Sequence, residues 1–236
     1  MKKKILCIAH RGSSAYKPEN TLAAFEKAIE QHADCIELDV QITKDAELVV
    51  YHDVFFKDGS LVREKTLAEV KYEGAERGID VPSLDEVLYF LNNRIKLNIE
   101  IKATGIVDAL LGKLKLYDRK KIICSSFIHE VLIEIRQKLP TLSTALISCA
   151  KYKDPVRILD EAACGILVQN HEFIDQAYVD LLHRKNKLIF AFTVNNRKGF
   201  KRMIDLGVDG IFTDYPDLLK SFCLSLETRI EQKTLN

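Results

Sequence analysis

The 236-residue chain lacks several features that each define a class of protein. No apolar run approaches the roughly 18 residues that span a membrane. Lysine plus arginine (35) and aspartate plus glutamate (34) nearly balance, so the chain has no basic excess of the kind that nucleic-acid-binding surfaces carry. The six cysteines include no Cys-x-x-Cys pair, and we expect them to be reduced, because disulfide frameworks belong to smaller secreted domains.

The N-terminus reads MKKKILCIAHRG, with a lysine cluster before a short apolar run, as in a secretion signal. That run covers only residues 5–9, which is shorter than the roughly 7–15 apolar residues of a signal peptide. Polar residues follow directly, and Gly12 is expected to let the backbone turn sharply there. We therefore predict a buried strand and a cytoplasmic protein.

Short apolar runs alternate with helical patterns along the chain. The runs are mostly continuous, which indicates strands covered on both faces, as in a parallel sheet. The predicted strands are 5–9, 35–42, 96–101, 121–126, 142–148, 165–169, 188–194 and 209–214, with a further strand-like piece at 47–52. The predicted helices are 20–32, 83–93, 129–139, 175–185 and 196–207, with weaker ones at 105–116, 155–163 and 216–228. Ser83 and Glu86 form a capping-box pattern, and Gly207 is placed as a C-cap.

Repeated strand–helix units in a chain of this length predict a (β/α)8 TIM barrel. A doubly wound open sheet is the alternative, but no Gly-x-Gly-x-x-Gly follows any predicted strand. The polar, glycine-containing stretch 54–80 does not fit the repeat, and we interpret it as a short insertion on the C-terminal face of the barrel. No linker suggests a second domain, so residues 1–236 are predicted to form one barrel domain.

The carboxyl ends of the strands hold the active site in such a barrel. Charged residues stand at or near these ends: His10, Arg11, Glu37, Asp39, His52, Glu100 and Lys102. Residues two apart in a strand share a face, so Glu37 lies beside Asp39, and Glu100 beside Lys102. We expect the three acids, which come from neighbouring strands, to converge.

Buried carboxylates are costly unless they are paired or bound to a metal. Three acids without a cysteine suit a hard cation, Mg²⁺ or Ca²⁺. The alternative is that Arg11 and Lys102 form salt bridges with the acids and no metal binds.

His10 and His52 are the predicted proton-transfer pair, because imidazole titrates near neutral pH and serves as acid or base. Arg11 and Lys102 supply positive charge that fits a phosphate. Together these residues predict metal-assisted cleavage of a small phosphorylated substrate. Three further residues are weaker candidates. His171 is a candidate substrate contact. Asn195 and Asp214 either bind ligand or cap the helices that follow them, and we favour the interpretation as helix caps.

These residues in this order resemble the glycerophosphodiester phosphodiesterase family, as a short bacterial member. The resemblance runs from residue 8 to about residue 217. Its carriers are IAHRGSSAYKPENTLAAF, DCIELDVQITKDAELVVYHD, VPSLDEVL, LNIEIK, SSF, FTVN and GVDGIFTDYPD. The first two stretches are the most specific.

The resemblance implies a function and a site. It assigns a divalent cation to Glu37, Asp39 and Glu100, catalysis to His10 and His52, and phosphate contact to Arg11 and Lys102. It also implies that Glu19 supports the site. The implied reaction is hydrolysis of a glycerophosphodiester to glycerol 3-phosphate and an alcohol, with the glycerol 2-hydroxyl as a candidate nucleophile that forms a cyclic phosphate.

Two departures from the family pattern concern the substrate pocket. Phe192 stands where many members have tryptophan. The phenylalanine keeps an apolar wall but lacks the N–H donor of the indole. The stretch 54–80 lacks the Arg-Thr-Thr-like sequence that commonly follows His-Asp. The identity of the leaving alcohol therefore stays open. The sequence does not indicate the oligomeric state. The alternatives are a phospholipase D-like lyase that acts on lysophospholipids and a binding protein without turnover.

Overall fold

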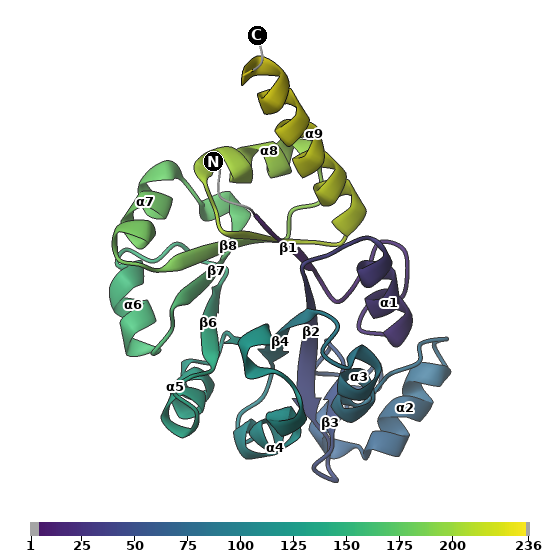
Figure 1. The fold of residues 1–236 in the computed structure, drawn as a ribbon. Coiled ribbons are helices and arrows are strands. Elements are labelled where there is room, and N and C mark those ends of the chain that lie inside the picture. The colour runs from purple at the N-terminus through teal and green to yellow at the C-terminus, as the bar shows by residue number, and fades with distance from the viewer. Residues whose placement is uncertain (1–4, 235–236) are drawn as a thin grey trace.

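Within the part of the chain that the structure describes, eight parallel strands close into a barrel (Figure 1). The computed structural model describes residues 5–234, and their side chains except at 116 and 227–234. The barrel strands are β1 (Leu6–Ala9), β2 (Cys35–Ile42), β4 (Lys96–Ile101), β5 (Ile122–Ser126), β6 (Ser143–Ser148), β7 (Ile166–Asn170), β8 (Leu188–Phe192) and β9 (Gly210–Thr213). β1 pairs in parallel with both β2 and β9, which closes the ring. The predicted TIM barrel is confirmed.

Helices surround the strands on the outside of the barrel (Figure 1). They are α1 (Leu22–Glu30), α3 (Leu84–Leu91), α4 (Val107–Lys113), α5 (His129–Lys138), α6 (Pro155–Glu161), α7 (Gln176–Arg184), α8 (Arg197–Leu206) and α9 (Pro216–Thr234). The capping box of Ser83 and Glu86 is present, and Gly207 has the left-handed φ of +80° expected of a C-cap. In residues 5–234, no helix has both the length and the apolar character that crossing a membrane requires.

The side chains of strand β2 alternate between the helices outside the barrel and the interior of the barrel. Its residues Leu38 and Val40 pack with the apolar side chains of α1 and α3. Successive residues of a strand point to opposite faces, so Glu37 and Asp39 face the inside of the barrel. The register pairs Asp39 with Glu100 of β4. The fold therefore brings these acids together inside the ring.

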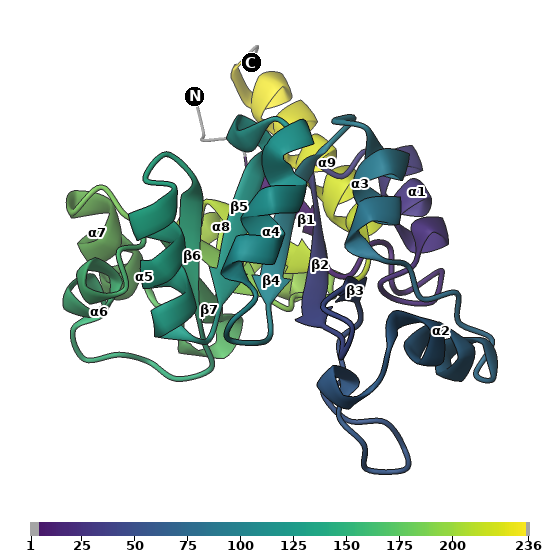
Figure 2. The ribbon, with the colours of Figure 1, turned by 90° about the horizontal axis from the view of Figure 1, so that it is seen from below.

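Residues 54–80 contain more regular structure than the sequence analysis assigned. The strand-like piece predicted at 47–52 precedes them as β3 (Leu48–Val50), which runs antiparallel to the end of β2. A loop follows in which Phe55 and Leu61 form an isolated bridge, and Figure 2 shows this loop extending past the end of β2. The 3-10 helix η1 (Val62–Glu64) and the helix α2 (Leu67–Ala75) come next. Thr66 and Glu69 form a capping box that begins α2.

Candidate active site

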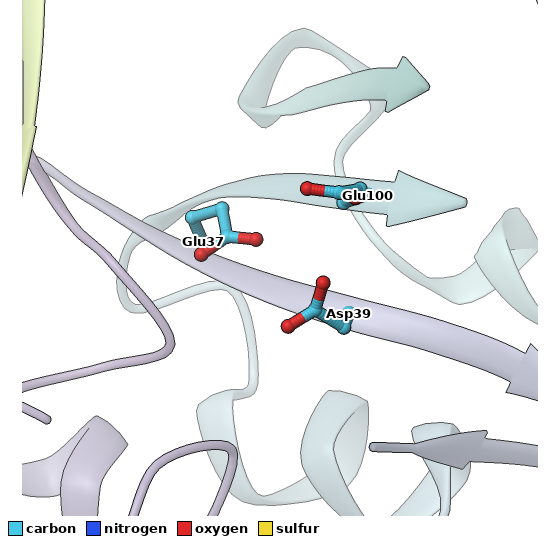
Figure 3. Close-up of side chains that lie close together, drawn as sticks. All are labelled: Glu37, Asp39 and Glu100. Atoms are coloured by element: carbon cyan, nitrogen blue, oxygen red, sulfur yellow. The ribbon is translucent and has the colours of Figure 1, made fainter. Parts of the chain in front are cut away.

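Three carboxylates meet between β2 and β4 (Figure 3). One oxygen from each of Glu37, Asp39 and Glu100 lies within 4.8 Å of the others. Glu37 and Asp39 are each 1% exposed. The convergence expected from the strand spacing is therefore present, and it comes from side-chain alternation in β2 together with the register of β4.

Burial and mutual repulsion disfavour the ionised forms of the carboxylates in this cluster. Burial and the charges of Asp39 and Glu100 raise the pKa of Glu37 well above its usual value, although Arg11 opposes the shift. Burial and the charge of Asp39 also raise the pKa of Glu100, against the effect of Lys102. Oε1 of Glu37 has no hydrogen-bond partner among the described residues. An oxygen-only set with an unpartnered buried oxygen fits a hard divalent cation.

Two cationic side chains form ion pairs with the same acids. Nε of Arg11 lies 3.3 Å from Oδ2 of Asp39, and Nζ of Lys102 lies 3.0 Å from Oε1 of Glu100 and 3.4 Å from Oδ1 of Asp39. The backbone N–H of Arg11 donates to Oε2 of Glu37 at 2.8 Å. The salt bridges considered in the sequence analysis are thus present, but two cations do not neutralise three carboxylates.

The Pro-Glu-Asn-Thr stretch orients Arg11 and Asp39. Both carboxylate oxygens of Glu19 accept from Nη1 of Arg11 at 2.9 Å. Nδ2 of Asn20 donates to Oδ2 of Asp39 at 2.8 Å, and the backbone N–H of Asp39 donates to Oδ1 of Asn20 at 3.2 Å. Thr21 then begins α1 as its N-cap. Glu19 therefore contacts a neighbour of the acids, and Asn20 is a site residue that the sequence analysis did not name.

His10 is held by a residue from the other end of the chain. Its Nδ1 lies 2.7 Å from Oδ1 of Asp214, which also accepts from Ser14 Oγ at 3.1 Å. Asn195 donates to the second oxygen of Asp214. The interpretation of Asn195 and Asp214 as helix caps was wrong, because Asn196 caps α8 and barrel closure turns Asp214 toward β1. Burial would raise the pKa of Asp214, but the hydrogen bond and charge of His10 lower it.

His52 also has a carboxylate partner at Nδ1. Its Nδ1 is 2.9 Å from Oδ1 of Asp53, and a positive charge on its ring opposes the rise in the pKa of Glu100. The buried Gln41 fixes this segment, since its Nε2 donates to the carbonyls of Tyr51 and Asp53, each at 2.8 Å. The sequence analysis missed Gln41, although its place two residues after Asp39 puts it on the same face of β2.

Phe192 belongs to an apolar cluster. It ends β8 and packs on the apolar residues inside the barrel, among them Phe190 and Phe212. Its carbonyl lies 3.2 Å from Nδ1 of His171. Within the described chain, no hydrogen bond, ion pair or ring contact joins Phe192 or His171 to the acids or to His10 and His52.

The arrangement suits proton transfer beside a charged phosphate. In both His10 and His52, Nδ1 faces a carboxylate, and the described residues form no hydrogen bond to Nε2. A carboxylate at Nδ1 favours the tautomer with its proton there, which leaves Nε2 to exchange a proton with a substrate. Buried acids, two cations and two oriented imidazoles together can bind and cleave a phosphate ester.

Comparison with known proteins identifies a family and relatives that cleave phosphate esters. The model of the glycerophosphoryl diester phosphodiesterase family matches residues 10–218. A glycerophosphodiester phosphodiesterase of Caldanaerobacter subterraneus subsp. tengcongensis is 37% identical over 237 residues, which cover 92% of this chain and 96% of the relative. One from Bacillus altitudinis is 34% identical over 230 residues, covering 89% of this chain and 94% of the relative.

A solved structure shares the fold. It is an Oleispira antarctica phosphodiesterase in complex with the product sn-glycerol-3-phosphate. It superposes with a TM-score of 0.84 at 27% identity, and the match covers 92% of this chain and 95% of that one.

Proposed function

This chain belongs to the glycerophosphoryl diester phosphodiesterase family, and from that premise we propose that it cleaves glycerophosphodiesters to glycerol 3-phosphate and an alcohol by metal-assisted acid–base catalysis. Glycerophosphodiester hydrolysis is the activity of the family. The metal and the residue roles are our proposal. The observation that carries it is the trio Glu37, Asp39 and Glu100 inside the barrel, with an unpartnered oxygen on Glu37.

The acids would hold one divalent cation, and their oxygen donors suit either Mg²⁺ or Ca²⁺. When bound, the cation would supply positive charge to the phosphate oxygens and the glycerol hydroxyls. Arg11 and Lys102 stand against the same acids, so their charges would offset the negative charge that builds on the phosphate oxygens during cleavage. Glu19 and Asn20 would hold Arg11 and Asp39 in place for this task.

His10 and His52 would move the protons through their Nε2 atoms. One imidazole takes a proton from the attacking hydroxyl, and the other gives a proton to the oxygen of the departing alcohol. Asp214 and Asp53 keep the ring protons on Nδ1 and orient both rings. The symmetry of these two pairs leaves either histidine able to serve as the base.

The attacking hydroxyl would be the 2-hydroxyl of the glycerol. Its oxygen bonds to phosphorus, the bond from phosphorus to the alcohol oxygen breaks, and a 1,2-cyclic glycerol phosphate forms. Water then opens the ring to glycerol 3-phosphate. Phosphorus NMR during turnover would detect the cyclic phosphate, and a direct product without it under single-turnover sampling would exclude this route.

A coupled assay for glycerol 3-phosphate tests the proposal. The diesters of choline, ethanolamine, glycerol and inositol would be supplied to the purified protein with EDTA, and then with Mg²⁺ or Ca²⁺ restored. We expect activity only with the cation. Full activity after EDTA treatment, with metal analysis showing no bound cation, would overturn the metal assignment.

A second candidate function is cleavage of lysophospholipids by the same residues. The loop after β3 extends past the end of β2 (Figure 2) and exposes two apolar side chains, Val54 (41% exposed) and Phe55 (60% exposed). These could contact an acyl chain. Release of choline from lysophosphatidylcholine, with a cyclic lysophosphatidic acid resolved by phosphorus NMR, would support this candidate, and no release would exclude it.

A further inference from the structure

A groove of about 330 Å³ adjoins the acids at Lys102. The loop after β3 forms one side of it through Val54, Leu61 and Arg63. The residues after β4 and β5 form the other side through Lys102, Thr104 and Ile128. Lys102 thus belongs to both the groove and the charged centre. A group that extends from a phosphate bound near Lys102 can enter this groove directly.

The charge of the groove is one-sided. Among the described residues that line it, none has a carboxylate or an aromatic ring, and the two cations are Lys102 and Arg63. Lys102 is paired with Glu100 and Asp39. Arg63 is exposed, and it forms no ion pair or hydrogen bond with any residue in the described part of the chain. The groove therefore presents one guanidinium that is available to a ligand.

The rest of the lining is largely apolar, with Ile42, Val54, Leu61, Val62 and Ile128. Apolar walls reduce the local dielectric screening, so a charge in the groove interacts more strongly with Arg63 than it would on an open surface. A quaternary ammonium group is usually bound by aromatic faces, which this groove lacks. A phosphate or carboxylate can instead bind a guanidinium through two parallel hydrogen bonds.

We propose that this groove receives the leaving alcohol and that Arg63 selects alcohols that carry an additional anionic group over choline. The inference rests on the proposed function, because the groove acts only on substrates that the charged centre cleaves. It names the substrate class: glycerophosphodiesters whose second alcohol bears a phosphate or a carboxylate. Arg63 is a specificity residue and takes no part in bond cleavage.

Three diesters with the same glycerophosphate half test the proposal. Glycerophosphocholine has a cationic leaving group, glycerophosphoglycerol a neutral one, and bis(glycerophospho)glycerol an anionic one. We expect kcat/KM, corrected for the two equivalent bonds of the last substrate, to be highest for the anionic and lowest for the cationic diester. The preference should weaken as salt is raised from about 0.01 M to 1 M, because salt screens the exposed guanidinium.

The variant Arg63→Gln removes the charge from the groove. We expect its ratio of kcat/KM for the anionic over the choline diester to fall by roughly three- to tenfold, as for loss of one charge-assisted contact. Arg63→Glu should reverse the preference. Lys57→Gln is the matched control, because Lys57 is an exposed cation of the same loop that does not line the groove. Its ratio should equal that of the unaltered protein.

The outcomes separate this inference from the proposed function. If glycerophosphoglycerol is cleaved but the ratio is the same in the unaltered protein, Arg63→Gln and Arg63→Glu, the role of Arg63 is excluded and the hydrolase stands. Faster cleavage of glycerophosphocholine than of the anionic diester by the unaltered protein also excludes it. If none of the three diesters releases glycerol 3-phosphate with Mg²⁺ or Ca²⁺ present, the proposed function fails, and this inference fails with it.

Discussion

Oδ1 of Asp214 lies 2.7 Å from Nδ1 of His10, although 204 positions separate the two residues in the chain. The contact follows from closure of the barrel. Ala9 of β1 pairs with Thr213 of β9, so the residues that come directly after these strands meet at the same edge. A carboxylate at this place favours the tautomer of His10 with its proton on Nδ1. We therefore expect Asp214 to be a positioning residue for His10.

The variant Asp214→Asn should lower kcat by about 10²-fold or more, because an amide can donate to Nδ1 and favour the wrong tautomer. KM should change little, since Asp214 does not touch the phosphate in this scheme. The ¹⁵N chemical shifts of the His10 ring would report the tautomer directly. Asp217→Asn is the control, because Asp217 lies nearby in the first turn of α9 but accepts from Tyr16 and does not contact His10. Unchanged ring shifts in Asp214→Asn would contradict the positioning role.

Loss of either histidine should cost at least the roughly 10²-fold typical of an acid–base group. We expect this fall in kcat for both His10→Ala and His52→Ala, with the thermal midpoint close to that of the unaltered protein. His129→Ala is the control, because His129, the first residue of α5, forms no hydrogen bond or ion pair with the acids in the part of the chain that the structure describes. Near-normal turnover by either of the first two variants would remove that histidine from the catalytic pair.

The metal-free protein should lose stability as the pH rises. The folded-state pKa of Glu37 is raised above its unfolded value of about 4.3. Between these two pKa values the folded state binds more protons than the unfolded state, so the free energy of unfolding falls with rising pH. Urea titrations in EDTA at several pH values would measure it. A free energy of unfolding that rises across this window would contradict the raised pKa.

The variant Glu37→Gln should remove part of this pH dependence and make the metal-free protein more stable at neutral pH, because one carboxylate fewer is then buried beside Asp39 and Glu100. The amide oxygen can still accept the backbone N–H of Arg11 that Glu37 accepts. The same variant should lose both activity and the rise in thermal midpoint on adding Mg²⁺ or Ca²⁺. Glu130→Gln, on the exposed face of α5, should show none of these changes.

The strands and the acid trio could be predicted because both depend on local pattern. Continuous apolar runs mark the barrel strands, and the i, i+2 spacing of Glu37 and Asp39 fixes their shared face. Asp214 could not be placed in the same way, because its contact with His10 depends on ring closure between the first and last strands. The local sequence near Asp214 is typical of a helix start and so predicts that Asp214 caps the helix that follows it.

Helix α2 and the position of Arg63 were also not predicted from the sequence, for different reasons. Helix α2 carries the same Ser/Thr-x-x-Glu pattern that identified α3, here from Thr66 to Glu69, but its apolar face is narrow and its length is nine residues. Arg63 has no pattern of its own. It lines the same groove as Lys102 because of the path that the loop after β3 takes, which no spacing rule predicts.

Gln41 gives the last prediction, because it holds His52 through the backbone alone. It is 4% exposed, and its amide donates to the carbonyls of Tyr51 and Asp53 on either side of His52. Gln41→Met keeps the side-chain length and removes the donors. Unsatisfied buried carbonyls should cost about 1–3 kcal/mol of unfolding free energy.

Because His52 would then be less firmly placed, kcat should fall in Gln41→Met while metal affinity, set by the acids, stays the same. Gln137→Met on the exposed face of α5 is the matched control for the substitution itself. Urea unfolding, kcat and a Ca²⁺ titration would be measured on both variants. A loosely held imidazole loses its alignment with the oxygen it exchanges a proton with before the barrel itself is affected. A stability loss without a change in kcat would therefore show that Gln41 supports the fold of this segment but does not position His52.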